Sequence, residues 1–93
     1  MLVAVEGELE GTLAPVVSGS NRLGRHPECE VCLPSEWISR HHARIECQRG
    51  TFLIEASSDK PTILNSERLE RGELHDGDTI TLGKTTLRFR SIL

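Results

Sequence analysis

The sequence lacks several features that would place it in a larger or membrane-bound class of protein. It contains no stretch near the roughly 18 apolar residues that a membrane span requires, and residues 1–6 (MLVAVE) do not have the basic start of a secretion signal. With 93 residues it has room for one domain and one small core. We therefore expect a single domain over residues 1–93, soluble and cytoplasmic, with no direct membrane insertion.

Cysteine is scarce, and its spacing is unlike that of a disulfide framework. Cys29, Cys32 and Cys47 are odd in number, which favours a reducing compartment. His26 together with the Cys29–Cys32 pair offers an incomplete zinc-ligand set, because a structural zinc site needs four ligands. The apolar surroundings of the cysteines instead indicate small strand residues. We expect no metal and no cofactor.

Positive charge is also in deficit. The net charge of −3 argues against general nucleic-acid binding, because a chain that neutralises many phosphates usually carries a basic stripe or tail. The charge is unevenly distributed, since acidic residues crowd positions 67–78. Four arginines fall in the first half of the chain: Arg22, Arg25, Arg40 and Arg44. This asymmetry favours an anionic partner.

Apolar and polar residues alternate along the chain, and no segment of helical length repeats with a period of 3.6 residues. Residues 43–48 and 86–90 alternate, and residues 51–54 and 79–82 form further β-branched or apolar runs. Turn-forming clusters separate them at 18–21, 49–50, 57–61, 76–78 and 83–84. Residues 2–17 are expected to add one or two edge strands. The pattern predicts an all-β fold, a two-sheet antiparallel β-sandwich.

Polar side chains gather in three of the connections between strands, where a rigid sandwich displays its binding groups. Arg25 follows Gly24 at the end of one predicted strand, Ser39 and Arg40 precede another, and the third group lies in the loop 57–62. Composition alone explains them equally well as solvated loop charges. Two arginines and a serine that converge would form an oxyanion receptor, because a guanidinium fork matches phosphate geometry and a hydroxyl adds a neutral donor.

The order and spacing of these motifs resemble the forkhead-associated (FHA) domain family. The matching pieces are LGR at 23–25, ISRHHARI at 38–45, TILN at 62–65 and LHDGDTITLG at 74–83. Each is weak alone, but together they span residues 23–83 in the family's order. The resemblance implies a β-sandwich of the SMAD/FHA type that binds phosphothreonine peptides through loops at one end, as a signal-transduction and protein–protein interaction module. It also implies a monomeric domain within a longer protein.

The resemblance assigns roles to individual residues. Arg25 matches the arginine that holds the phosphate, and Ser39 matches the serine that donates to a phosphate oxygen. Arg40 occupies the next position, where family members often carry another phosphate contact. Gly24 and His42 match positions of loop scaffolding, with His42 as a buried ring that bridges two loops by hydrogen bonds.

The third loop departs from the family pattern. FHA domains commonly carry a Ser/Thr-Asn pair there, whose asparagine grips the peptide backbone beside the phosphothreonine. Ser58, Asp59 and Lys60 are the candidate peptide contacts in this chain, and none of them is an asparagine. Asp59 would repel a phosphate, whereas Lys60 would attract it. Asn65 is interpreted as a turn residue that supports the site.

Two alternatives to phosphopeptide binding remain. An enzyme would need a nucleophile, a base and a third orienting group; Ser39 and His42 offer the first two, but their spacing is unfavourable and no third group stands out. We therefore expect no enzymatic activity. The second alternative is an FHA-like structural interaction domain, for instance in a secretion or membrane-associated assembly, that binds independently of phosphorylation. The altered third loop favours it, whereas Arg25, Ser39 and Arg40 favour the phosphopeptide.

Overall fold

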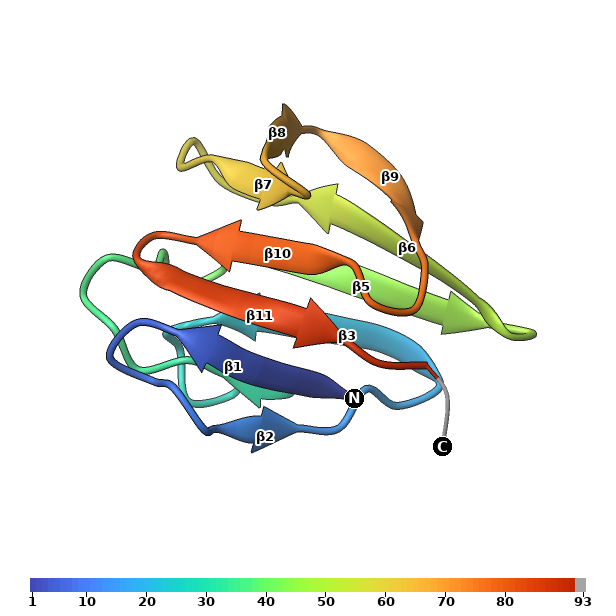
Figure 1. Cartoon of the computed structure of the whole chain (residues 1–93), viewed down its shortest axis with the longest axis horizontal. Helices are drawn as coiled ribbons and strands as arrows, with labels where there is room; N and C mark the ends of the chain where they lie inside the picture. The colour runs from blue at the N-terminus through green and yellow to red at the C-terminus, as the bar shows by residue number, and fades with distance from the viewer. Residues whose placement is uncertain (92–93) are drawn as a thin grey trace.

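The computed structural model describes residues 1–91, which form two β-sheets packed face to face (Figure 1). One sheet has the order β2-β1-β11-β10-β7-β8, with β1 (Leu2–Glu6), β2 (Leu13–Ala14), β7 (Thr62–Leu64), β8 (Glu67–Leu69), β10 (Thr79–Leu82) and β11 (Thr85–Phe89). The other has the order β4-β3-β5-β6-β9, with β3 (Gly19–Gly24), β4 (Val31–Cys32), β5 (Ala43–Gln48), β6 (Thr51–Ala56) and β9 (Arg71–Leu74). The predicted β-sandwich is confirmed; only the pairing of β3 with β4, among these strands, is parallel.

Alternation along the strands builds the core. In β5 the side chains of Ala43 and Ile45 are buried and that of Arg44 is exposed, so one face of the strand meets the core and the other meets water. Phe52 of β6 and Phe89 of β11 join the two sheets edge to face, with ring centroids 4.8 Å apart. The largest fully buried apolar side chains are Phe89, Leu2, Leu23, Leu33, Ile38, Ile45, Ile54, Ile80, Leu82 and Leu87. Each contributes about 1.5–3 kcal/mol relative to an exposed position.

Several local expectations need correction. Residues 18–21 were expected to form a turn, but β3 begins at Gly19, because the buried Asn21 amide accepts the Val17 N–H at 2.8 Å and donates to the Ile45 carbonyl at 3.1 Å. Of the two expected edge strands, only β2 is an edge; β1 lies between β2 and β11. Strands β8 and β9 escaped sequence analysis because they are three and four residues long and carry mostly polar side chains.

The cysteines only partly match the expected apolar role. All three are free thiols. Cys29 is buried, but it precedes β4 rather than lying in a strand. Cys47 is half-buried in β5. The interpretation of Cys32 as an apolar strand residue is wrong in one respect, because its side chain is exposed at the edge of the sheet.

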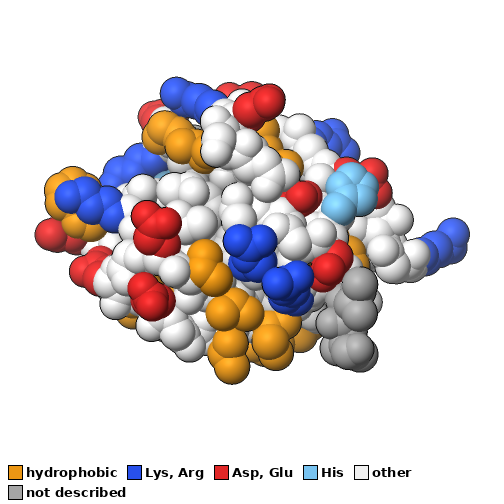
Figure 2. All heavy atoms as spheres, in the orientation of Figure 1, with side chains coloured by type: hydrophobic (Ala, Val, Ile, Leu, Met, Phe, Trp, Pro, Cys, Tyr) orange, Lys and Arg blue, Asp and Glu red, His pale blue; other side chains and the backbone are white. Residues whose placement is uncertain are grey.

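Exposed hydrophobic side chains cluster in the N-terminal segment. Met1, Val5, Leu13 and Val17 are each more than a third exposed. In Figure 2 hydrophobic atoms gather at the lower edge of the face shown, where β1 and β2 lie in Figure 1. Within residues 1–91 no helix has the length and apolar character needed to cross a membrane.

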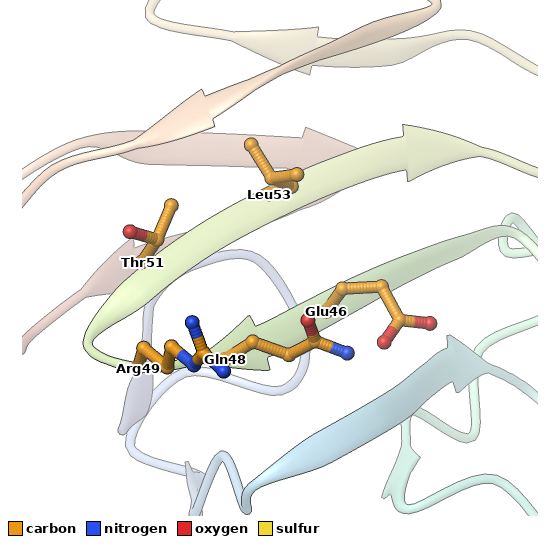
Figure 3. A pocket seen from close by; sticks show the side chains of 5 residues that line it. All are labelled: Glu46, Gln48, Arg49, Thr51 and Leu53. Carbon is orange, nitrogen blue, oxygen red and sulfur yellow. The ribbon is translucent and has the colours of Figure 1, made fainter.

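Several connections share one end of the sandwich, on the left in Figure 1. Among them are the β3–β4, β4–β5 and β6–β7 connections and the β10–β11 turn. The β5–β6 turn at Arg49 and Gly50 lies at the opposite end. There the outward side chains of the hairpin line a shallow pocket of about 270 Å³, formed by Glu46, Gln48, Arg49, Thr51 and Leu53 (Figure 3).

Gly24 allows the β3–β4 and β4–β5 connections to touch. A Cβ atom at this position would lie 2.1 Å from the Arg40 carbonyl oxygen. The φ of Gly24 is not in the positive range, so a left-handed backbone conformation is not the reason for this glycine. The glycine is required by space, since the backbone of the Arg40 loop occupies the place of a side chain.

We predict that Gly24→Ala lowers the free energy of unfolding by about 1–3 kcal/mol, because the added methyl group overpacks a backbone contact. Urea denaturation measures this change. Gly72→Ala is the matched control, since a Cβ there meets only Leu64 and Leu69 side-chain atoms at 3.8 and 3.9 Å, which is ordinary contact. Equal stability of the two variants would contradict the close approach.

Candidate functional site

Arg25 is fixed to the β4–β5 connection by its own backbone and side chain. Its N–H donates to the Ser39 carbonyl at 3.0 Å, and its Nε donates to the Ile38 carbonyl at 3.1 Å. The Ile38 side chain is fully buried and anchors this part of the loop in the core. The outer nitrogens of the Arg25 guanidinium make no hydrogen bond within residues 1–91, so they are available to a ligand at the surface.

His42 connects the β4–β5 and β6–β7 connections. Its ring is completely buried; Nδ1 accepts the Ser39 N–H at 3.2 Å, and Nε2 lies 2.9 Å from the Pro61 carbonyl oxygen. The His42 backbone carbonyl also accepts the Ser57 N–H at 3.0 Å. This is the arrangement expected for the ring from the sequence.

The two partners of the ring determine its protonation state. A backbone N–H can only donate and a carbonyl can only accept, so Nδ1 must be unprotonated and Nε2 must carry the hydrogen. Burial lowers the pKa of His42, although the hydrogen bond to Pro61 opposes this effect. His42 is therefore a neutral structural ring.

The Ser39 hydroxyl has no partner among the described side chains. Because both His42 ring nitrogens are engaged with backbone groups, neither is available to take a proton from that hydroxyl. The serine and histidine therefore do not form a nucleophile–base pair. The Ser39 side chain is half-exposed, and its hydroxyl is suited to donate a hydrogen bond to a ligand.

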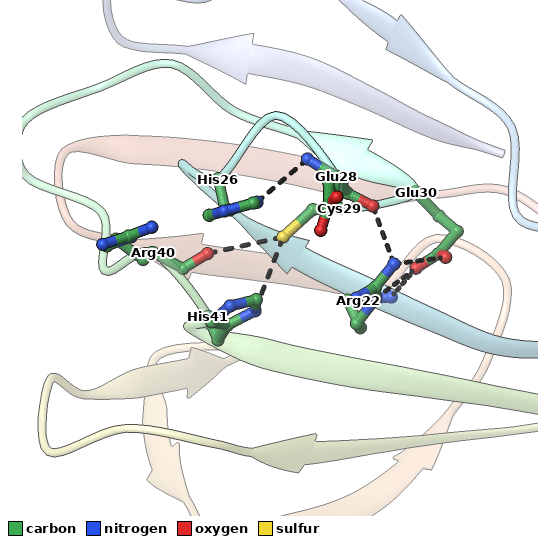
Figure 4. Close-up of polar contacts among 7 residues, drawn as sticks. All are labelled: Arg22, His26, Glu28, Cys29, Glu30, Arg40 and His41. Carbon is green, nitrogen blue, oxygen red and sulfur yellow. Dashed lines mark hydrogen bonds and ion pairs between the residues drawn. The ribbon is translucent and has the colours of Figure 1, made fainter.

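Arg40 is presented by a small cluster that sequence analysis did not find (Figure 4). The Arg40 carbonyl accepts the His26 N–H at 3.2 Å and the buried Cys29 thiol at 3.4 Å. Burial raises the pKa of Cys29, which keeps the thiol protonated as a donor. The His41 ring stacks on His26, with centroids 5.3 Å apart, and its Nδ1 lies 3.9 Å from the Cys29 sulfur.

The four arginines of the first half of the chain separate into two classes. Arg22 pairs with Glu30 at 3.0 Å and lowers the pKa of that carboxyl to about 2 through hydrogen bonds. Arg44 pairs with Glu46 at 3.3 Å and Glu55 at 2.9 Å. In the part of the chain that the structure describes, no carboxylate oxygen lies within 4.0 Å of a guanidinium nitrogen of Arg25 or Arg40.

In the third loop, the candidate residues Ser58, Asp59 and Lys60 differ in exposure. The side chains of Asp59 and Lys60 are exposed beside Pro61, whose carbonyl is held by His42. The Ser58 hydroxyl is buried without a protein partner. A contact between Ser58 and a peptide would need that hydroxyl to turn outward, and the assignment of these three residues stays a prediction.

Asn65 lies away from this end of the sandwich. Strand β7 separates it from the third loop, and both Asn65 and Ser66 have positive φ, at 49° and 72°, as a tight turn requires. The Asn65 side chain donates to Asp78 at 3.0 Å and accepts the Thr79 N–H at 2.9 Å. It is a turn residue, as expected, and it joins the β7–β8 turn to the start of β10 rather than contacting the Arg25 loop.

Within residues 1–91, two guanidiniums without carboxylate partners and a hydroxyl without a protein partner lie on loops that share backbone hydrogen bonds, at one end of the sandwich. Charge-assisted hydrogen bonds from such groups match a phosphate oxygen cluster.

Comparison with known sequences identifies the family. A sequence model of the FHA domain matches residues 21–83. The chain belongs to the FHA domain family. The resemblance read from the motifs at 23–83 is thereby confirmed.

Individual FHA-containing relatives are longer than this chain. It is 34% identical over 90 residues to an ABC transporter ATP-binding/permease protein of Mycobacterium tuberculosis, covering 96% of this chain and 10% of that protein. It is 32% identical over 90 residues to an oxoglutarate dehydrogenase inhibitor of Corynebacterium diphtheriae, covering 96% of this chain and 63% of that protein. The chain thus spans less than two thirds of either relative.

The fold of this chain closely matches that of a solved FHA structure. This structure, described as an analysis of phosphothreonine-dependent FHA domain interactions, superposes with a TM-score of 0.87 at 29% identity, covering 96% of this chain and 92% of that one. The match is to a binding module rather than to a catalytic domain.

The Cys29–Cys32 pair has no metal-binding geometry in the part of the chain described. No group of three or more His, Cys, Asp or Glu side chains within residues 1–91 is placed to hold a metal ion. The Cys29 thiol is engaged with Arg40, and Cys32 lies at the exposed sheet edge.

We predict that stability of this FHA domain depends on pH through His42. Its pKa is lowered in the folded protein and returns to about 6.5 on unfolding, so the unfolded chain binds more protons between these two values. The contribution of His42 to the free energy of unfolding is therefore constant above about pH 6.5. It decreases as the pH falls below 6.5 and levels off below the folded-state pKa.

Urea denaturation across this pH range tests the prediction, with His42→Gln as the comparison. The variant should be less stable near neutral pH by about 1–3 kcal/mol, because it leaves buried partners unsatisfied. It should also lose part of the pH dependence, since the other three histidines are common to both proteins. Identical pH profiles would show that His42 is not the titrating group.

Proposed function

We propose that this FHA domain is a phosphothreonine-dependent protein interaction module. The observation that carries the proposal is that, within residues 1–91, Arg25 and Arg40 have no carboxylate partner and the Ser39 hydroxyl has no hydrogen-bond partner, on connections joined by the hydrogen bond from the Arg25 N–H to the Ser39 carbonyl. In this proposal Arg25 grips the phosphate through its guanidinium fork, Ser39 donates to a phosphate oxygen, and Arg40 adds positive charge.

The loop scaffold supports the same role. Gly24 permits the Arg25 and Arg40 loops to touch, and His42 fixes the Ser39 backbone to the third loop. A receptor whose loops are already tied together loses less conformational entropy when a peptide binds. The likeness to a structure of phosphothreonine-dependent FHA interactions supports the choice of guest.

The proposal extends to the setting of the domain. It acts as a monomeric domain of a longer signalling protein in the cytoplasm, with a phosphothreonine-containing protein as its partner and no nucleic acid. Three free thiols and a net charge of −3 support the compartment and the exclusion of nucleic acid. The greater length of its relatives supports the proposal that the domain is part of a longer protein.

We predict that Arg25→Ala weakens phosphothreonine-peptide binding by about 1.5–3 kcal/mol, the size of a hydrogen bond to a charged group. Arg25→Lys should restore little, because an ammonium cannot reproduce the fork. Calorimetric titration measures both, with Arg71→Gln on the outer face of β9 as the control for loss of one positive charge. Wild-type affinity in Arg25→Ala would remove Arg25 from the site.

A second prediction concerns which peptide residue the site prefers. A phosphorylated side chain carries about −1.5 to −2 charges near neutral pH, so the arginines should prefer it strongly to glutamate. Burial of the threonine methyl group is worth about 0.8 kcal/mol, or roughly fourfold over phosphoserine. One peptide carrying phosphothreonine, phosphoserine, glutamate or threonine should bind in the order phosphothreonine, phosphoserine, then neither of the others.

The same titrations at two salt concentrations should show weaker phosphopeptide binding at the higher salt, because contacts among exposed charges are screened. Equal affinities for the threonine and phosphothreonine peptides would contradict the proposal. That result would favour an FHA-like structural module that binds independently of phosphorylation, as the altered third loop allows.

A further inference from the structure

The chain has only two lysines: Lys60 lines a pocket beside the proposed phosphate-binding loops, and Lys84 lies over a tryptophan that lines the same pocket. The pocket has a volume of about 210 Å³ and is lined by Trp37, Lys60, Pro61, Ile63 and Gly83. The ammonium of the second lysine, Lys84, lies 4.0 Å from the centre of the Trp37 ring. The β4–β5 connection, the β6–β7 connection and the β10–β11 turn therefore meet here around a mainly apolar surface.

Trp37 is held in place although its side chain is 45% exposed. A Cβ atom at Gly83 would lie 2.4 Å from the Trp37 carbonyl oxygen, and Gly83 has a φ of 60°. Only glycine fits such a close backbone contact in that conformation. The β10–β11 turn thus packs directly on the Trp37 backbone and places Lys84 over the indole ring, where a cation–π interaction orients the ammonium.

The pocket is formed by the same connections that carry the proposed phosphate site. Trp37 is two residues before Ser39 in the same connection, and Lys60 directly precedes Pro61, whose carbonyl oxygen is held by the His42 ring. A peptide bound at Arg25 and Ser39 therefore has the pocket within reach of its neighbouring residues.

The charge around the pocket has no internal compensation. Within residues 1–91, no carboxylate oxygen lies within 4.0 Å of the ammonium nitrogen of Lys60 or Lys84. The carboxylates that adjoin the pocket in sequence, Glu36 and Asp59, are exposed and make no hydrogen bond to either lysine. In a chain of net charge −3, both ammoniums are thus left for an external anion.

We propose that this pocket takes an acidic side chain of the bound peptide, an inference that rests on the proposed phosphopeptide function. The methylene groups of a glutamate pack on Trp37 and Pro61, and its carboxylate lies near the ammoniums of Lys60 and Lys84. An apolar side chain would cover the same surface but would leave both ammoniums without a carboxylate partner. Lysine acts as a point charge, so a single carboxylate is sufficient.

The inference is tested with one phosphothreonine peptide in which each flanking residue in turn is glutamate or its neutral isostere glutamine. At one flanking position the wild-type domain should bind the glutamate peptide about fivefold more tightly at low salt, the range of an exposed ion pair. Lys60→Gln and Lys84→Gln should each reduce this preference, and the double variant should abolish it.

Arg49→Asn is the control for general charge, because it removes one positive charge at the opposite end of the sandwich and asparagine tolerates the positive φ of 52° there. It should leave the preference for glutamate unchanged. Thermal unfolding confirms that the variants are folded, which is expected because both lysine side chains are exposed.

The possible outcomes separate this inference from the proposed function. Equal affinities of the wild-type domain for the glutamate and glutamine peptides at every position, with phosphothreonine still required, would overturn the acidic pocket and leave the proposed function intact. A glutamate preference that persists in the double lysine variant would also overturn it. Loss of the phosphothreonine requirement itself would instead overturn the proposed function.

Discussion

The binding end of this FHA domain depends on one buried imidazole. His42 accepts a hydrogen bond from the Ser39 backbone and donates one to the Pro61 carbonyl, so two connections that are 19 residues apart in sequence are joined at a single ring. The ring fills this role only in its neutral form, because protonation of Nδ1 would place two donors against each other. Its burial opposes that protonation. Ser39 and the third loop therefore keep their relative positions without a bound ligand.

The second constraint is the distribution of ion pairs. Arg22 and Arg44 lie in β3 and β5. Glu30 of the β3–β4 connection pairs with Arg22, and Glu46 of the same strand and Glu55 of the neighbouring strand β6 pair with Arg44. Arg25 and Arg40 lie beyond the strand ends, where no carboxylate approaches within 4.0 Å in residues 1–91. The chain is acidic overall, yet within residues 1–91 these two neighbouring connections keep two arginines free of carboxylate partners. Such local positive charge favours the binding of an anion.

The third loop shows how an altered residue can change the kind of contact rather than remove it. An asparagine offers a donor and an acceptor to a peptide backbone, whereas Lys60 offers only donors and a charge. The Lys84 ammonium lies 4.0 Å from the centre of the Trp37 ring, and Lys60 lines the same proposed pocket as Trp37. Asp59 or Lys60 stands where the family's asparagine is expected, so the third loop fits a domain proposed to read the charge of the peptide beside its phosphothreonine.

The sequence by itself determined the β-sandwich and the family, because alternation with a period of two and the Gly24-Arg25 and Ser39-Arg40 motifs are local signals. It also indicated His42 as a buried ring. Only the tertiary structure decided the contacts between segments distant in sequence: the space that requires Gly24, the inward Ser58 hydroxyl and the position of Asn65 at the far end of β7. Such contacts depend on which backbone lies opposite each residue, and sequence spacing does not contain that information.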